Sequence, residues 1–199
     1  DERVIDYLNG IAKNAQILDI ASGQGYLSER LSWVGYKNIF TADINNQNFR
    51  LDKEKFNFRK IDANDDLPYK DKFFDVVISC ETIEHLENPK QFIEEIYRIL
   101  KPGGSFILST PSVEGIISRL YFLFMGKLAF HTKNDYELSG HIAILPSWLL
   151  IRFINSAGFK EEARTYNAFY LPILKLRFTQ SFFLNRFFGW IAIHKFVKD

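Results

Sequence analysis

The stretch I-L-D-I-A-S-G-Q-G-Y-L-S-E-R-L, residues 17–31, contains the features that decide the fold of this chain. Its apolar beginning, Ile17 to Ile20, predicts a short buried strand, and a helical pattern of apolar residues follows almost at once. Gly23 and Gly25 lie between the two, where residues without side chains let the backbone turn sharply and approach a ligand closely. A strand, a glycine turn and a helix in this order are typical of a parallel α/β sheet.

The rest of the chain continues this alternation of strands and helices. Apolar periodicity and end signals, such as Asn88 at an N-cap with Pro89 at the first helical position, predict each element. We therefore expect a mostly parallel sheet with helices on both faces. The predicted strands are 17–20, 39–43, 56–62, 74–80, 105–110, 159–169 and 190–197. The predicted helices are 4–11, one with the apolar stripe Leu27, Leu31 and Val34, 89–100 ended by K-P-G-G at 101–104, 114–129, and 147–157; residues 130–142 are expected to form a polar loop.

Composition limits the classes of protein to which the chain belongs. Its 199 residues are 47% apolar and 25% charged, which predicts one globular domain over residues 1–199. The net charge of +1 gives no support for a nucleic-acid partner. Cys80 is the single cysteine and has no internal disulfide partner. No signal peptide is visible, and the apolar runs fall short of the roughly 18 residues that a membrane span needs. We therefore expect a cytoplasmic enzyme.

Asp19 distinguishes between the ligands that a glycine turn of this kind can hold. A dinucleotide site needs a third glycine, where this chain has Ser28, and an acid before the glycines would repel a pyrophosphate. The N-terminus of the following helix favours a carboxylate, whereas Asp19 favours an ammonium group. The loop therefore suits a ligand that carries a carboxylate, an ammonium group and a nucleoside.

An ordered set of motifs accompanies this loop. In order and spacing, the set resembles the class I S-adenosylmethionine-dependent methyltransferases of the ubiquinone-biosynthesis-like group over about residues 15–160. The motifs are L-D-I-A-S-G-Q-G (18–25), A-D (42–43), I-D-A-N-D-D-L-P-Y (61–69), F-D-V-V-I-S-C-E-T-I-E-H-L (74–86), R-I-L-K-P-G-G (98–104) and S-G-H (139–141).

The resemblance implies a Rossmann-like, seven-stranded, mostly parallel sheet with its last strand antiparallel. It also implies a helical insertion over about residues 111–145 that covers the acceptor, followed by C-terminal strands and an aromatic-rich segment within 159–199. S-adenosylmethionine is the implied methyl donor. The family usually has glycine where Ala21 stands, so the loop is expected to be slightly tighter here.

The resemblance also implies a role for each residue that matches a motif. Asp19 and the backbone from Ala21 through Gly23 to Gly25 would hold the amino-acid end of the donor. Asp43, with Ile44 beside it, would accept the ribose hydroxyls. The remaining implied contacts are Asp62 to the adenine amino group, the Ala63 N–H toward the adenine ring, and Cys80 and Glu81 under the sulfonium.

The E-T-I-E-H stretch carries the candidate catalytic groups. In a helical turn Glu81, Glu84 and His85 would share one face, directed at the cofactor cleft. One hypothesis makes His85 a general base, or an orienting group, for a hydroxyl acceptor. A second has Glu81, Glu84, His85 and His141 bind a divalent ion that lowers the pKa of the hydroxyl, as in related small-RNA 2′-O-methyltransferases and some quinone-precursor methyltransferases. A third makes His85 purely structural. His131 and His194 are interpreted as non-catalytic, and Cys80 as an apolar filler.

The acceptor side is less specific. S-C-E-T at 79–82 lacks the Asp/Asn-Pro-Pro-aromatic motif of enzymes that methylate amino groups of DNA bases, which favours hydroxyl acceptors that are small-molecule, lipid-like or glycan. Tyr136 and His141 are the polar groups expected to face the acceptor. The aromatic segment 171–188 is interpreted as core packing, with a homodimer contact as one variant, in preference to a membrane-surface contact. A nicotinamide-dependent oxidoreductase and a non-catalytic cofactor-binding module are the alternatives from other classes.

Overall fold

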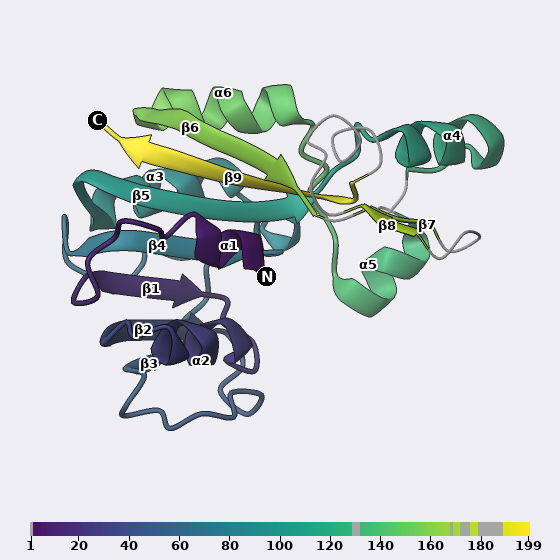
Figure 1. The fold of residues 1–199 in the computed structure, drawn as a ribbon. Coiled ribbons are helices and arrows are strands. Elements are labelled where there is room, and N and C mark those ends of the chain that lie inside the picture. Colours follow the sequence, from purple (N-terminus) through teal and green to yellow (C-terminus); the bar gives the residue numbers. More distant parts are fainter. Residues whose placement is uncertain (1, 129–131, 168, 172–175, 179–188) are drawn as a thin grey trace.

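Seven strands form one sheet in the order β3-β2-β1-β4-β5-β9-β6 (Figure 1). The computed structural model describes residues 2–128, 132–167, 169–171, 176–178 and 189–199. The strands of the sheet are β1 (Gln16–Ile20), β2 (Asn38–Asp43), β3 (Phe58–Lys60), β4 (Phe74–Cys80), β5 (Leu100–Pro111), β6 (Phe159–Tyr166) and β9 (Ile191–Lys198). The first five run parallel, and β9 is antiparallel to both of its neighbours, β5 and β6. The predicted Rossmann-like sheet with an antiparallel last strand is therefore confirmed.

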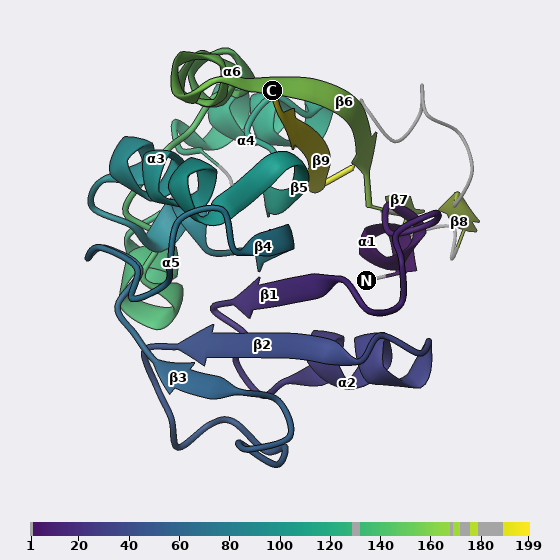
Figure 2. The same ribbon diagram turned by 90° about the vertical axis from the view of Figure 1, so that its left-hand side faces the viewer.

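Helices cover both faces of the sheet, as predicted (Figure 2). One face carries α1 (Glu2–Asp6) and α2 (Tyr26–Trp33), and the other carries α3 (Pro89–Ile99) and α6 (Ser147–Ala157). Each face has its own core, because successive strand residues point to opposite sides of a sheet. Leu18 and Ile20 pack with α3 and α6, whereas Ile17 packs with α1 and α2.

The strand order reverses direction between β1 and β4. From β1 the chain adds β2 and then β3 on one side, and it then crosses to add β4 and β5 on the other. In open parallel sheets, ligands bind beyond the carboxyl ends of the strands at such a reversal. The fold therefore places the candidate site just past the ends of β1 and β4.

The start of α3 follows the predicted capping pattern. The Asn88 side chain accepts a hydrogen bond from the Gln91 backbone N–H at 3.2 Å, and Pro89 occupies the first turn. This satisfies one of the backbone donors that a helix start leaves unpaired. Phe92, Ile93 and Ile96 are then buried against the sheet.

Several predicted boundaries were wrong. Residues 130–142 include a helix, α5 (Lys133–Ser139), in which Lys133 and Glu137 form an i,i+4 ion pair. The K-P-G-G segment belongs to β5, since Leu100 already pairs with Phe74 of β4. Val34 lies beyond the end of α2 and is 42% exposed, so it is not part of the buried stripe. The other shortened elements are α1, β3, β6 and α4 (Ile116–Met125), which occupies part of the predicted helix 114–129, whereas β9 keeps the predicted length and begins one residue later.

A second, two-stranded sheet pairs β7 (Phe169–Leu171) with β8 (Leu176–Phe178) and was not predicted. Most of the aromatic segment 171–188, as well as His131, lies outside the described residues, so the interpretations of both stay predictions. Among the residues that the structure describes, no helix is long and apolar enough to cross a membrane.

A matched pair of alanine substitutions tests the loop before α2. Gly23 and Gly25 both have left-handed backbones, with φ of 54° and 91°. A Cβ at Gly25 would lie 2.8 Å from a Leu51 methyl and 2.9 Å from the Phe49 ring, whereas nothing lies within 4 Å at Gly23. We expect Gly25→Ala to lower the free energy of unfolding by about 3 kcal/mol, from strain and overpacking together. Gly23→Ala should cost about 1 kcal/mol, from strain alone. Urea denaturation measures both, and equal losses would contradict the packing argument.

Candidate functional site

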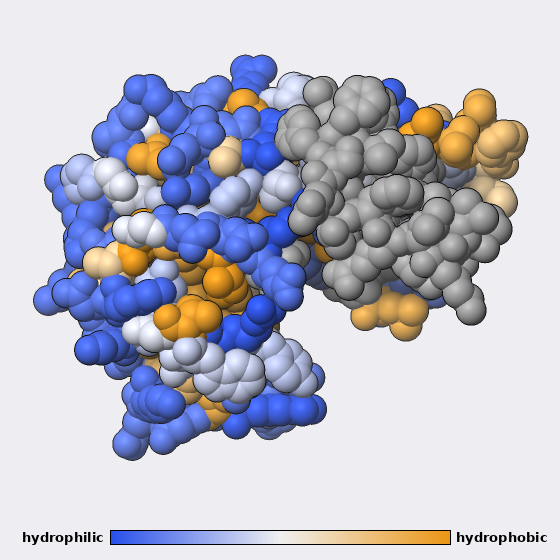
Figure 3. All heavy atoms as spheres, in the orientation of Figure 1, coloured by the Kyte–Doolittle hydropathy of each residue, from blue (hydrophilic) through white to orange (hydrophobic). Residues whose placement is uncertain are grey.

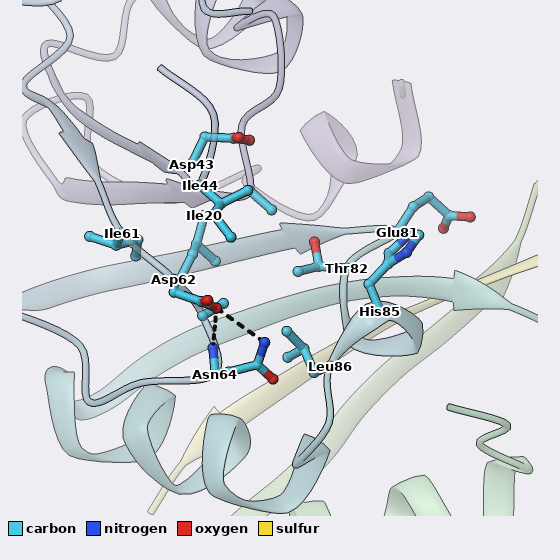
Figure 4. Close-up of a pocket in the computed structure, with 12 residues that line it drawn as sticks. Ile20, Asp43, Ile44, Ile61, Asp62, Asn64, Glu81, Thr82, His85 and Leu86 are labelled. Carbon is cyan, nitrogen blue, oxygen red and sulfur yellow. Dashed lines mark hydrogen bonds between the residues drawn. The ribbon is translucent and has the colours of Figure 1, made fainter. Parts of the chain in front are cut away.

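A pocket of about 220 Å³ opens at the carboxyl ends of β1, β2, β3 and β4 (Figure 4). Asp62 and Asn64 lie on one side of it, and Glu81 and His85 on the other. The pocket is thus located at the reversal of strand order. It is lined by Ile20, Ala21, Asp43, Ile44, Ile61, Asp62, Ala63, Asn64, Glu81, Thr82, His85 and Leu86.

Strand pairing brings the ends of these four strands to the same level. Ile20 pairs with Ala42 of β2 on one side and with Ser79 of β4 on the other. Just beyond the paired residues, Ala21 and Glu81 both have left-handed backbones, with φ of 58° and 49°. Such conformations cost free energy for residues with a side chain and cluster at functional sites. The two strained residues border the same pocket.

Asp43 ends β2 with both carboxylate oxygens directed to backbone donors. Its Oδ2 accepts a hydrogen bond from the Gly23 N–H at 2.7 Å, and its Oδ1 accepts one from the Asn45 N–H at 2.8 Å. An ionised carboxylate has about four acceptor positions. Asp43 therefore retains one acceptor position on each oxygen and can receive two further donors.

Asp62 follows β3 and is oriented by Asn64. The Asp62 Oδ1 accepts hydrogen bonds from the Asn64 backbone N–H at 2.9 Å and from its side-chain amide at 3.1 Å (Figure 4). The Asn64 Oδ1 in turn accepts the Glu87 N–H at 2.8 Å, which ties this loop to the chain after β4. Asn64 was not among the predicted site residues, although its position two residues after a strand-end acid is typical of an Asx turn.

Asp19 is not among the pocket-lining residues. Strand alternation directs its side chain to the opposite face of the sheet from Ile20, where the buried Ser28 hydroxyl of α2 donates to its Oδ2 at 2.6 Å. Burial, which leaves Asp19 2% exposed, raises the pKa of its carboxyl to about 6. Asp43 raises this pKa further, and the Ser28 hydrogen bond opposes the shift. Ser28, which stands where a dinucleotide-binding motif has its third glycine, is therefore the hydrogen-bond partner of Asp19.

Gly23, Gly25 and Cys80 are not lining residues either. Open space surrounds Gly23, beside Asp43, but Leu51 and Phe49 fill the space above Gly25. Burial raises the pKa of the Cys80 thiol to about 12, with further contributions from Asp19 and other neighbours. A thiol with this pKa stays protonated at neutral pH and is a poor nucleophile, in line with the filler interpretation.

Polar residues at the end of β5 hold the acids of the E-T-I-E-H stretch. The Ser109 hydroxyl donates to the Glu81 Oε1 at 2.7 Å, and the Thr110 hydroxyl donates to the Glu84 Oε2 at 3.1 Å. Burial raises the pKa of Glu81, and it raises the pKa of Glu84 to about 8, with repulsion from Glu81 as the second cause. The S-T-P sequence at 109–111 is the signal for these partners, which the sequence analysis did not use.

The helical turn expected over Glu81, Glu84 and His85 is not formed, although Glu81 and His85 both line the pocket, as expected. The turn that forms is the short 3₁₀ helix η1 (Ile83–His85), and Glu81 precedes it in a left-handed conformation. The groups that meet are Glu84, His85 and His141, whose nearest ligand atoms all lie within 4.8 Å of one another. Within the described part of the chain, the Glu84 Oε1 is buried without a hydrogen-bond partner.

Backbone hydrogen bonds bring His141 to this place. The Glu84 carbonyl accepts the N–H groups of both Ile142 and Ala143, at 2.9 Å each, which anchors the chain after α5 to η1. The rings of His85 and His141 then meet edge to face, with centroids 4.8 Å apart. Tyr136, the other polar residue expected near the acceptor, is exposed on α5 and is not a pocket-lining residue.

His194 lies away from the pocket on β9. It is fully buried, and its Nδ1 lies 2.8 Å from the Glu161 Oε1. Burial lowers the pKa of His194. For Glu161, desolvation by burial raises the pKa, but hydrogen bonds and charge interactions with His194 and Arg164 outweigh it and hold the pKa at about 2. These contacts pair β9 with β6 and agree with a packing role for His194.

Comparisons with known proteins agree with this geometry. Residues 18–108 match a family described as a methyltransferase domain. The chain is 29% identical over 174 residues to the ubiquinone/menaquinone biosynthesis C-methyltransferase UbiE of Psychromonas ingrahamii, covering 76% of this chain and 69% of that protein. It is 34% identical over 110 residues to the mitochondrial ubiquinone biosynthesis O-methyltransferase of Dictyostelium discoideum, covering 47% of this chain and 34% of that protein. A solved SAM-dependent methyltransferase from Archaeoglobus fulgidus shares the fold, with a TM-score of 0.73 and 22% identity over 99% of this chain and 90% of its own.

The fold, the pocket at the strand reversal and the matched domain together define a class I S-adenosylmethionine-dependent methyltransferase. The matches make the chain a distant homologue of the ubiquinone/menaquinone biosynthesis methyltransferases, and S-adenosylmethionine is the methyl donor that the matched methyltransferase domain implies. The oxidoreductase and the non-catalytic module are thereby set aside.

Burial of Asp19 should make stability depend on pH. Its pKa is about 6 in the folded protein and 3.8 in the unfolded chain, so the folded state binds more protons between these values. Stability is therefore lost as pH rises from 4 to 6, by about 3 kcal/mol in total. We expect Asp19→Asn, which mimics the protonated acid, to be more stable than wild type by about this amount at pH 8 and nearly equal to it at pH 4. Urea denaturation across this range measures the difference. A difference independent of pH would contradict the assignment.

Proposed function

We propose that this methyltransferase transfers the methyl group of S-adenosylmethionine to a hydroxyl oxygen of a small or lipid-like acceptor. The observation that carries the proposal is the pocket itself, which has Asp43 and Asp62 at one end and Glu81 and His85 at the other. The first pair suits the nucleoside of the donor. The second pair suits an acceptor that must lose a proton as its oxygen is methylated.

The donor set of the pocket fits the nucleoside. Asp43 has one acceptor position left on each oxygen, which matches the two hydroxyls of a ribose. Among the described residues, no hydrogen bond involves the Asp62 Oδ2, so this oxygen can accept an adenine amino group while Asn64 holds Oδ1. Ile20, Ile44, Ile61 and Ala63 provide the apolar surface for the ring. Such a pattern of apolar walls with few polar groups is typical of nucleoside sites.

The amino-acid end of the donor is assigned to the glycine loop. Gly23 lies in open space beside Asp43, so a ligand can approach its backbone, and the N-terminus of α2 favours a carboxylate. Asp19 acts from beneath this loop, as a buried negative charge held by Ser28, and it favours the ammonium group of the donor without lining the pocket.

The chemical step depends mainly on position. S-adenosylmethionine supplies a methyl group on a cationic sulfur, and holding the acceptor oxygen in line with it provides much of the rate acceleration. His85 lines the pocket and is assigned as the base that takes the hydroxyl proton on a ring nitrogen. Glu81, fixed by Ser109, and His141, in contact with His85, define the acceptor end.

A metal-assisted mechanism is the second candidate, favoured by one observation. Glu84, His85 and His141 provide one carboxylate and two imidazoles within 4.8 Å, a set that suits a divalent ion such as zinc or manganese. Such an ion would lower the pKa of the acceptor hydroxyl. The buried, unpartnered Oε1 of Glu84 supports this candidate. The cluster retains three members of the predicted ligand set, Glu84, His85 and His141, but does not include Glu81.

The nucleoside assignment predicts a loss of donor affinity. We expect Asp43→Asn to weaken binding of S-adenosylmethionine and of its demethylated product equally, by roughly 10- to 100-fold, because a charge-assisted hydrogen bond to the ribose is lost. Asp66→Asn, which changes an exposed acid in the loop after β3, is the matched control and should bind like wild type. Isothermal titration calorimetry measures all three proteins. Equal affinity in wild type and Asp43→Asn would refute the assignment.

The acceptor chemistry is tested with a dihydroxybenzene that carries an alkyl chain, because this probe offers both hydroxyl oxygens and ring carbons. With a ¹³C-labelled methyl donor, we expect the product to be a methyl ether by NMR, and the rate to persist after chelation of metals. His85→Gln should lower the rate about a hundredfold at unchanged donor affinity, because a general base is lost.

Two other results would change the mechanism. A methyl group on a ring carbon would replace oxygen by carbon as the acceptor atom, as in the named activity of the UbiE relatives. A rate that falls on chelation and returns when Mn²⁺ or Zn²⁺ is added would favour the metal-assisted mechanism over the base mechanism. In that case His141→Ala should abolish the metal-dependent rate.

A further inference from the structure

The second half of α4 exposes six consecutive large apolar side chains. Leu123 and Phe124 are 71% and 76% exposed, and the run extends from Leu120 to Met125. Figure 3 shows apolar atoms gathered over α4, where the helix projects from the body of the molecule (Figure 1). Monomeric proteins in water rarely leave such a contiguous apolar patch uncovered, so the patch indicates a contact surface.

The exposed residues surround the helix axis. Successive residues of an α-helix are rotated by about 100°, so six consecutive positions cover every side of the helix. A second protein copy with a flat surface would bury one face of α4 and leave the rest in water. A fluid apolar medium can contact all sides of the helix end at once. The distribution of exposure therefore favours lipid over a second copy.

The charge around α4 selects the kind of lipid surface. Between Glu114 and Asp135 the sequence has no acid, and its charged residues are Arg119, Lys127 and Lys133. Arg119 and Lys127, on either side of the apolar run, are both exposed. Cations next to aromatic and aliphatic side chains are typical of helices that bind anionic bilayers at the interface. At ten residues α4 is about 15 Å long, which is too short to span a bilayer.

The position of α4 connects this surface to the candidate site. α4 follows β5 at the end of the sheet toward which β1 runs, which is the end where the pocket opens (Figure 1). The chain after α5 then returns to the pocket, where His141 contacts His85. A bilayer in contact with α4 would therefore lie at the acceptor end of the site.

We propose that α4 docks the enzyme on an anionic lipid surface, with Leu120 to Met125 in the interfacial layer and Arg119 and Lys127 at the lipid headgroups. Docking at this place would present acceptors dissolved in the bilayer to the pocket. This consequence for the acceptor rests on the proposed function, whereas the docking itself does not. From the sequence, a membrane contact was the less favoured interpretation of residues 171–188, whereas the exposed apolar run among the described residues is on α4.

Vesicle co-sedimentation of the full chain tests the docking. We expect wild type to sediment with vesicles of phosphatidylcholine and phosphatidylglycerol, and to bind more weakly to phosphatidylcholine alone or at high salt. A variant with Leu123→Glu and Phe124→Glu should lose binding by at least about tenfold, because two apolar side chains leave the interface. Trp33→Glu changes a comparably exposed apolar residue on α2 and is the matched control, expected to bind like wild type.

The remaining measurements separate docking from the chemistry and from self-association. Thermal unfolding and donor affinity, which the double variant should retain, show that it is folded. Wild type that stays in the supernatant with anionic vesicles would overturn the proposal, as would a dimer in analytical ultracentrifugation that the double variant dissociates. Equal vesicle binding by wild type and the double variant would also overturn it. None of these results depends on methyl transfer, so the proposed function is judged by its own experiments.

Discussion

Strand β1 pairs with both β2 and β4, and the location of the pocket follows from this pairing. Because Ile20 pairs with Ala42 on one side and Ser79 on the other, three strands end at the same level. Parallel strands need crossover connections. Because the strand order reverses at β1, the connections after β1 and β3 lead to opposite sides of that strand and leave a crevice between them. The residues that follow each strand are thereby gathered around one pocket, although they come from distant parts of the sequence.

The site is built at a cost in stability. Asp19 is a buried carboxylate whose charged form burial disfavours, and Ala21 and Glu81 adopt left-handed backbones where glycine would be relaxed. Glu84 is a second buried acid with a raised pKa. Hydrogen bonds from Ser28, Ser109 and Thr110 offset part of this cost and hold the acids in place. Strain and buried charge gathered in one region are typical of functional sites.

The insertion after β5 serves two surfaces at once. Its end is anchored by the Glu84 carbonyl, which accepts two backbone N–H groups and positions His141 against His85. Its beginning, α4, extends an apolar surface away from the body of the protein. One segment therefore carries both His141, which contacts the pocket-lining His85, and the apolar surface proposed to bind lipid.

The sequence by itself determined the class of fold, the order of the strands along the chain and the strand-end acids Asp43 and Asp62, because periodicity, glycine turns and caps are local signals. The folded chain alone shows that Ser28 donates to Asp19 and that Glu84 gathers with His85 and His141 in a cluster without Glu81. It likewise shows that the apolar side chains of α4 from Leu120 to Met125 are exposed. These relations join residues far apart along the chain, and they depend on strand register and on which face each side chain takes. A shift of one residue in strand register turns each side chain to the opposite face of the sheet, and no local sequence pattern specifies the register.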